Sequence, residues 1–98
     1  MYKKITWSPL SVNDFEIVLE YLHENWNEQV VMKYITEIET LLSNISKQPN
    51  LFPLVNKKLK VRKCVITKHN TLYYRIKENN IEIIRIFDTR QNPKKLKI

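Results

Sequence analysis

The apolar residues of this chain recur at helical spacing in its first half and alternate as in strands in its second half. The first helical stripe consists of Phe15, Val18, Leu19, Leu22 and Trp26. It predicts an amphipathic helix. Ser8 followed by Pro9 predicts the helix start, because serine caps helices and proline suits the first helical position. Before it, the alternation of Ile5 and Trp7 predicts a short strand over residues 2–7.

A second helix is predicted directly after the first. Its apolar stripe consists of Val31, Tyr34, Ile35, Ile38, Leu41, Leu42 and Ile45. Asn27 is a suitable N-cap, and Gln48-Pro49 ends the pattern because proline cannot continue a helix. The two helices are therefore expected to form a hairpin with a very short connection, their apolar stripes facing each other.

From residue 57 onwards the pattern changes to strands. Stretches rich in Val, Ile, Leu, Tyr and Phe predict strands at residues 60–67, 71–77 and 81–87. Asn70 and the pair Asn79-Asn80 predict tight turns between them, since asparagine tolerates a left-handed backbone and the chain has no glycine. Residues 49–54 are predicted as a loop.

The expected fold class is α+β, in the order β-α-α-β-β-β. An N-terminal strand precedes the helical hairpin, which packs on a C-terminal antiparallel β-meander. Residues 1–98 are expected to form a single domain that ends in a basic tail, residues 91–98.

Strand periodicity divides the predicted meander into an inner and an outer face. The residues that this alternation places in the core are Leu72, Tyr74, Ile76, Ile84 and Ile86. Trp7, Trp26 and the lone Cys64 are also expected to be buried, while the buried face of the strand at residues 60–67 stays open. The residues expected on the outer face are Arg62, Tyr73, Arg75 and Arg85. Arginines interleaved with tyrosine suit a nucleic-acid surface, because arginine neutralises phosphate while the ring stacks on a base.

The net charge also differs between the two parts of the chain. Residues 57–98 hold thirteen Lys/Arg against three acidic residues, a net charge of +10, while residues 1–56 carry −3. A cationic surface of this kind collects polyanions or acidic proteins. Three explanations of this surface stay open at this point: it binds nucleic acid, it binds an acidic protein, or it is simply a solvated sheet face. The row Glu16, Glu20 and Glu24 is expected to be a solvated helix face.

Several kinds of chemistry are improbable. Without glycine the chain cannot build a phosphate-binding loop or a dinucleotide fold. The single cysteine, Cys64, and the distant His23 and His69 do not have the spacing of a zinc site. His69 has no second group at a defined spacing that would support acid–base catalysis. No apolar run is long enough to cross a bilayer, so a cytoplasmic location is expected.

The order of these elements and several short motifs resemble the RelE/ParE superfamily of bacterial type II toxin–antitoxin toxins, and within it the ParE-like, plasmid-stabilisation branch. The motifs are Ile5-Thr6-Trp7-Ser8-Pro9, Glu20-Tyr21-Leu22, Gln48-Pro49 with Phe52-Pro53, Arg62-Lys63-Cys64-Val65, Leu72-Tyr73-Tyr74-Arg75-Ile76 and Ile81-Glu82-Ile83-Ile84-Arg85-Ile86-Phe87. The resemblance covers nearly the whole chain. It implies a small cytoplasmic toxin that is neutralised by a cognate antitoxin, which wraps around it and contacts the basic sheet.

The resemblance implies one of two targets. RelE-like members cleave mRNA on the ribosome, whereas ParE-like members inhibit DNA gyrase by binding it. The nucleases often carry arginine directly before the position of Leu72 and a tyrosine near that of Leu96, but here Thr71 and Leu96 stand there. The resemblance therefore favours a gyrase inhibitor that blocks growth without hydrolytic chemistry.

These arguments define the expected sites and partners. The residues expected to contact the target or the antitoxin are Arg62, Tyr73, Arg75, Arg85, Arg90, Lys94 and Lys95. For a nuclease, the expected catalytic residues are Arg62, Lys63, Lys68, His69 and Arg90. No metal or cofactor is expected. The expected partners are an antitoxin and DNA gyrase, or the ribosome and mRNA in the alternative. A basic binding module without toxicity is a third possibility, and a homodimer is one open arrangement.

Overall fold

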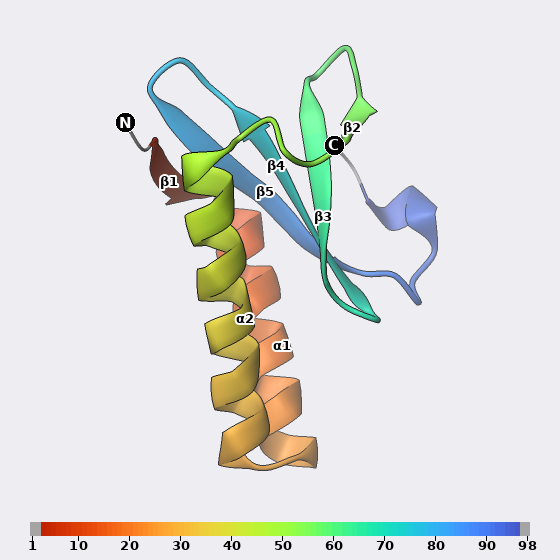
Figure 1. Ribbon diagram of the computed structural model, residues 1–98. Coiled ribbons are helices and arrows are strands. Elements are labelled where there is room, and N and C mark those ends of the chain that lie inside the picture. The colour runs from red at the N-terminus through yellow and green to blue at the C-terminus, as the bar shows by residue number, and fades with distance from the viewer. Residues whose placement is uncertain (1–2, 97–98) are drawn as a thin grey trace.

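The computed structural model describes residues 3–96 as one sheet and a helical hairpin (Figure 1). The elements are β1 (Lys4–Trp7), α1 (Pro9–Asn25), α2 (Glu28–Lys47), β2 (Leu54–Asn56), β3 (Val61–Thr67), β4 (Asn70–Ile76), β5 (Asn80–Asp88) and the 3-10 helix η1 (Pro93–Lys95). The strands are ordered β1-β5-β4-β3-β2. Strands β2 to β5 form an antiparallel meander, and β1 joins β5 in parallel.

This architecture confirms the predicted α+β fold. The short strand β2 is an addition, because it lies within and just beyond the segment predicted as a loop. The three predicted strands of the meander are found within one residue of their expected bounds. The first strand begins at Lys4, so Lys3 is not part of it, and the predicted start at residue 2 lies outside the described residues. Between residues 3 and 96, no helix is long and apolar enough to cross a membrane.

Both predicted helix caps are present. The Ser8 hydroxyl accepts a hydrogen bond from the Ser11 amide at 3.1 Å, and the Asn27 side chain accepts one from the Val30 amide at 3.1 Å. Ser8 Oγ also donates to the carbonyl of Ile84 at 2.7 Å. The start of α1 is thereby attached directly to β5.

The core lies between α2 and the sheet. Its buried residues are Tyr34, Ile38, Ile45, Cys64, Leu72, Tyr74, Ile81, Ile83 and Ile86. The inner face predicted for β4 and the buried position of Cys64 are thus confirmed. The Tyr74 hydroxyl donates to the carbonyl of Pro49 at 2.7 Å and ties the loop after α2 to the core.

An extra residue in β5 changes which side chains of that strand are buried. Arg85 pairs with Tyr73 and Ile83 pairs with Tyr74, so Ile84 is a bulge. Ile83 is fully buried while Ile84 is only partly so. The prediction that Ile84 lies in the core and Arg85 is exposed is therefore wrong, because strict alternation fails at a bulge.

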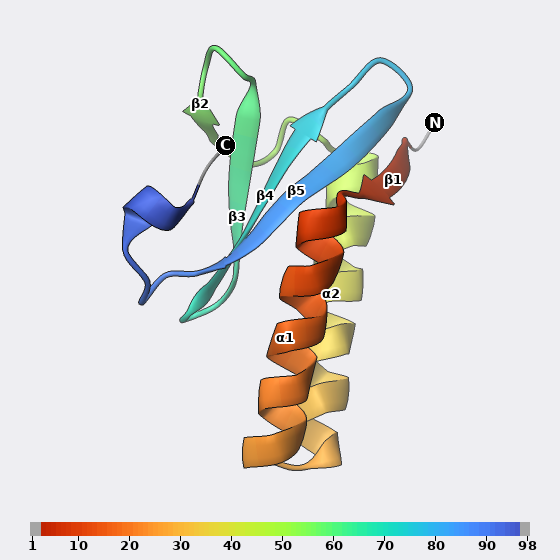
Figure 2. The same cartoon turned by 180° about the vertical axis from the view of Figure 1, so that it is seen from behind.

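The hairpin formed by α1 and α2 extends beyond the sheet, and its far end projects away from it (Figure 2). Trp26 lies at this end and keeps 62% of its surface exposed. Its predicted place in the core is therefore wrong, whereas Trp7 packs against the core. The acidic row Glu16, Glu20 and Glu24 is exposed, as expected.

The prediction of left-handed asparagines in the turns is also wrong. Within residues 3–96, Lys60 is the one non-glycine residue with positive φ, at 58°. It lies in the turn between β2 and β3, a connection that the sequence pattern did not reveal.

Candidate functional site

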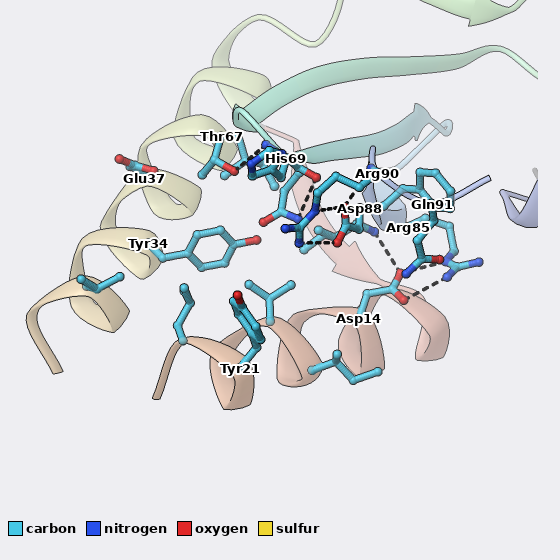
Figure 3. A pocket seen from close by; sticks show the side chains of 18 of the residues that line it. Asp14, Tyr21, Tyr34, Glu37, Thr67, His69, Arg85, Asp88, Arg90 and Gln91 are labelled. Carbon is cyan, nitrogen blue, oxygen red and sulfur yellow. Dashed lines mark hydrogen bonds and ion pairs between the residues drawn. The ribbon is translucent and has the colours of Figure 1, made fainter. Parts of the chain in front are cut away.

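A groove of about 790 Å³ separates the projecting helical hairpin from one end of the sheet (Figure 3). Its helical wall includes Ile17, Val18, Tyr21, Leu22, Trp26, Val30 and Tyr34. Its opposite wall comes from the turn between β3 and β4 and from the end of β5. Ile17, Tyr21 and Trp26 are each at least half exposed. The groove is thus an open apolar surface of the kind that marks an interaction site.

Tyr34 is the most unusual polar group in the groove. It is 4% exposed, and its ring stacks on Phe15 with the ring centroids 6.2 Å apart. Among the described residues, its buried hydroxyl has no hydrogen-bond partner. Burial raises the pKa of Tyr34, with smaller contributions from Glu37 and Asp14, so the hydroxyl keeps its proton. Since the side chain points toward the groove (Figure 3), this unsatisfied donor lies just beneath the groove surface.

A polar cluster of His69, Asp88 and Arg90 lies across the groove from Tyr21 and Tyr34 (Figure 3). The Thr89 amide donates to the His69 carbonyl at 2.8 Å, which joins the β3–β4 turn to the chain after β5. Arg90 binds Asp88 through two nitrogens, Nε at 3.0 Å and Nη2 at 2.7 Å. The Arg90 hydrogen bond is the largest cause of a lowered pKa at Asp88.

Arg85 forms a second, more buried ion pair. Its Nε and Nη2 bind the two carboxylate oxygens of Asp14 in α1 at 2.8 and 3.0 Å. The Ile86 amide donates to the same carboxylate at 3.0 Å. The Asp14 hydrogen bond raises the pKa of Arg85. β1 pairs with β5 only as far as Ile83, and Asp14 supplies the hydrogen-bond acceptor for the Ile86 amide beyond that point. Asp14 thereby joins this edge of β5 to α1.

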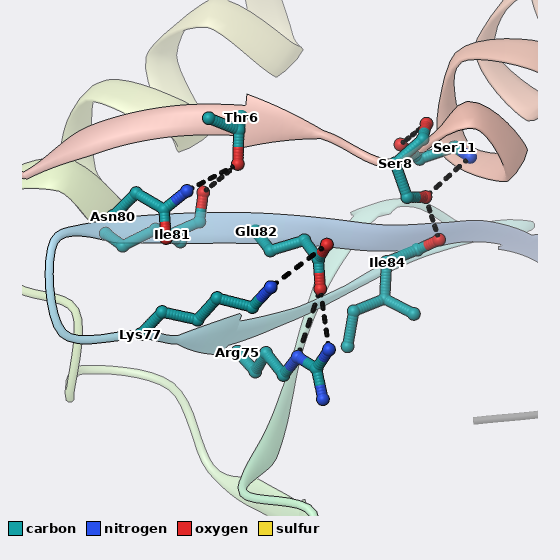
Figure 4. Close-up of polar contacts among 9 residues, drawn as sticks. All are labelled: Thr6, Ser8, Ser11, Arg75, Lys77, Asn80, Ile81, Glu82 and Ile84. Atoms are coloured by element: carbon teal, nitrogen blue, oxygen red, sulfur yellow. Dashed lines mark hydrogen bonds and ion pairs between the residues drawn. The ribbon is translucent and has the colours of Figure 1, made fainter.

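Arg75 is held on the sheet by Glu82 (Figure 4). Its Nε and Nη2 both lie 3.0 Å from Glu82 Oε1, and Lys77 lies 3.4 Å from the other oxygen. The strand register places Arg75 opposite Glu82, and Tyr73 between Lys63 and Arg85. Burial raises the pKa of Tyr73.

Arg62 is engaged by the loop after α2. Its Nη1 donates to the Phe52 carbonyl at 2.6 Å, and its Nη2 donates to the Asn50 side chain at 3.1 Å. Every arginine of the chain therefore has a partner within its own fold. The expected tail residues Lys94 and Lys95 are exposed in η1.

The expected binding residues are thus only partly brought together. Tyr73, Arg75 and Arg85 share one sheet face through the register, as predicted, but both arginines on it are held by carboxylates. Arg62 pairs with the buried Tyr74 and so lies on the opposite face, and its predicted place on the outer face is wrong. Arg90 lies beyond β5, at the groove.

The residues expected for a nuclease fall into two groups. His69 and Arg90 line the groove, with Lys68 beside them in the β3–β4 turn. Arg62 and Lys63 are neighbours in β3, so their side chains leave opposite faces of the strand. Thr71, in the position where the nucleases often carry arginine, is 5% exposed.

Sequence reasoning missed the groove and the roles of Asp14 and Tyr34. The Tyr34 ring was correctly placed on an apolar stripe, but the stripe does not show where its hydroxyl ends. Cys64 offers no reactivity, since burial raises its pKa to about 12. Within residues 3–96, no group of three or more His, Cys, Asp or Glu could hold a metal ion.

Residues 5–93 match the family model described as the ParE toxin of the type II toxin–antitoxin system parDE. The chain belongs to this family. Among curated proteins, no match is found. It is a toxin of the RelE/ParE superfamily, as the resemblance implied.

Solved structures share the fold of this ParE-family chain at low sequence identity. The chromosomal ParDE system from P. aeruginosa aligns at a TM-score of 0.73 and 15% identity, covering 89% of this chain and 96% of that one. A YoeB dimer from Staphylococcus aureus aligns at 0.63 and 20%, covering 89% and 97%. The E. coli DinJ–YafQ toxin–antitoxin complex aligns at 0.64 and 11%, covering 92% and 96%.

Proposed function

We propose that this toxin inhibits DNA gyrase by binding it, and that a cognate antitoxin neutralises the toxin. The observation that carries the proposal is the state of the arginines. Cleavage of RNA requires cations that stabilise a phosphorane. Both arginines expected for that role are occupied by oxygens of this chain, Arg62 by the Phe52 carbonyl and Arg90 by Asp88. Binding to a large partner needs no such free group.

The groove is the proposed antitoxin site. Its apolar helical wall suits the apolar face of an amphipathic segment, and the Tyr34 hydroxyl calls for a carbonyl or carboxylate acceptor from that segment. Solved structures of related fold include toxin–antitoxin complexes, which supports a partner of this class.

The test is supercoiling by purified gyrase in the presence of the purified toxin. We expect the toxin to block supercoiling, and the toxin saturated with its antitoxin to have no effect. Gyrase activity that is unchanged by excess free toxin would remove the proposal.

A ribosome-dependent mRNA nuclease is the second candidate. It is favoured by the cluster of His69, Asp88 and Arg90, which places an imidazole, a carboxylate and a guanidinium at one groove. Primer extension on translated mRNA would then show cuts at the ribosomal A site that His69→Gln abolishes. Transcripts that stay intact would exclude it.

We also propose that the toxin acts in the cytoplasm, where both targets lie, and that it serves plasmid stabilisation through growth inhibition of cells that lose its antitoxin. A homodimer is a proposed assembly of the free toxin. Light scattering of the purified toxin would establish its mass in solution.

A further inference from the structure

The free positive charge of the fold is concentrated in one hairpin. Since each arginine already binds an oxygen of this chain, lysines carry most of the positive charge that has no partner in the fold. Four of them lie within seven residues, Lys57, Lys58, Lys60 and Lys63, and all are exposed. Within residues 3–96 none of the four forms an ion pair with a carboxylate.

The backbone of this hairpin is fixed rather than extended freely. The Asn56 side chain accepts a hydrogen bond from the Leu59 amide at 2.9 Å and closes the turn between β2 and β3. Lys60 follows with φ of 58°, a left-handed conformation that costs free energy for a residue with a Cβ. The backbone that carries these lysines therefore has a defined conformation.

A small cleft of about 430 Å³ lies at the base of the hairpin. It is lined by Asn50, Leu54, Lys57, Lys60, Arg62 and Ile76. Two lysines without an ion pair thus face one concave surface, beside the engaged Arg62, and within the described residues no carboxylate lines it. Such a surface favours an anion with several oxygens.

The residue types distinguish between anionic partners. Single-stranded nucleic acid is recognised by stacking its bases on aromatic rings, but no aromatic residue lines this cleft or occurs in residues 57–63. Lysine is a point charge without the planar fork that pairs with carboxylates. A surface that has lysines but neither aromatic rings nor free arginines suits the phosphates of a duplex, because contacts to phosphates are independent of sequence.

We propose that the β2–β3 hairpin, residues 57–63, binds the phosphodiester backbone of duplex DNA without sequence preference. On the basis of the proposed function, this is DNA that gyrase carries, and the hairpin contacts it while another surface of the toxin holds the enzyme. The lysines neutralise phosphates, and the cleft accommodates one phosphate between Lys57 and Lys60.

The test compares two triple variants of the full chain by fluorescence anisotropy with a short labelled duplex at several salt concentrations. The hairpin variant is Lys57→Gln, Lys58→Gln and Lys60→Asn, because asparagine tolerates the left-handed turn. The control removes the same charge elsewhere, through Lys3→Gln, Lys4→Gln and Lys47→Gln. Circular dichroism verifies that both variants are folded.

We expect the hairpin variant to bind DNA at least about ten-fold more weakly at low salt, and its log–log salt slope to fall by about 2.7, or 0.9 per lost phosphate contact. The control should keep most of the affinity and the slope. Equal losses in both variants would overturn the proposal, since binding would then follow net charge alone. A hairpin effect confined to polyglutamate or to single-stranded RNA would also overturn it.

Gyrase inhibition is measured separately on the same variants. Localised DNA binding without gyrase inhibition by the wild type would refute the proposed function and leave the hairpin site standing. Gyrase inhibition by a toxin that binds no duplex would refute the hairpin site and leave the proposed function standing.

Discussion

Asp14 shows how a single residue determines the function of another. It accepts two hydrogen bonds from Arg85 and one from the Ile86 amide, and only 11% of its side chain is exposed. The Arg85 guanidinium therefore stabilises the fold and is not free to bind a partner. The same reasoning applies to Arg75 and Arg62, whose partners also belong to this chain.

Replacing Asp14 should therefore destabilise the fold strongly. Asp14→Ala leaves the Arg85 guanidinium and the Ile86 amide without their acceptor, which should cost about 2–4 kcal/mol of the free energy of unfolding. Urea denaturation measures the loss. Glu24→Ala, on the exposed row of the same helix, is the control and should change stability little. A loss at Asp14 no larger than that of the control would show that the ion pair is not a structural element.

The Tyr34 hydroxyl should have the opposite effect. Because it is buried without a partner, Tyr34→Phe removes an unsatisfied donor and should raise the free energy of unfolding by about 1 kcal/mol. The same change should weaken antitoxin binding, since the acceptor of the bound segment loses its donor. Calorimetric titration and urea denaturation of the same protein separate the two effects. A destabilised variant would mean that the hydroxyl already has a partner in the free toxin.

Asp88 gives a pH dependence whose sign is fixed by its lowered pKa. The folded state holds the carboxylate better than the unfolded state does, so the Asp88–Arg90 pair stabilises above the unfolded pKa. That contribution is lost as the pH falls through the lower, folded pKa. Because the pair is largely exposed, we expect this contribution to be small. Asp88→Asn should lose this amount near pH 7 and converge with the wild type in acid. A constant difference at every pH would contradict the assignment.

At the scale of the element, Ser8 connects a helix to a strand. It caps α1 and also donates to the carbonyl of the bulged Ile84, whereas Asn27 only caps α2. Ser8→Ala should thus cost about 2 kcal/mol, and Asn27→Ala about 1 kcal/mol, in the free energy of unfolding. Thermal and urea unfolding compare the two. Equal losses would show that the bond to β5 adds nothing.

The elements differ in how far the sequence could predict them. The helices and their caps depend on local patterns, which is why Ser8 and Asn27 were found. The bulge at Ile84 was not, because one extra residue in a strand leaves no mark in a period of two. Trp26 followed the apolar stripe of α1, but the stripe continues past the point where the sheet ends. The partners of the arginines lie as far as 71 positions away in the sequence. The sequence therefore identifies the cations, but it does not show whether each is free to bind a partner molecule.

At the scale of the whole molecule, charge follows the layers. Both helices and β1 belong to residues 1–56, with a net charge of −3, while the meander belongs mostly to residues 57–98, with +10. The groove lies where the two layers separate, and its two walls come from them. A partner that enters the groove therefore meets an acidic half on one side and a basic half on the other.

This separation predicts how the antitoxin associates. An acidic antitoxin is attracted by the basic layer before it touches the groove, so its association rate should fall about ten-fold or more from low to high salt. The dissociation rate should change little with salt, because apolar contacts in the groove and the bond to Tyr34 oppose release. Tyr34→Phe should therefore speed dissociation and leave the salt dependence of association unchanged, whereas the hairpin variant should reduce that dependence. Stopped-flow kinetics with both variants separates these effects, and an association rate that is insensitive to salt would contradict electrostatic attraction by the basic layer.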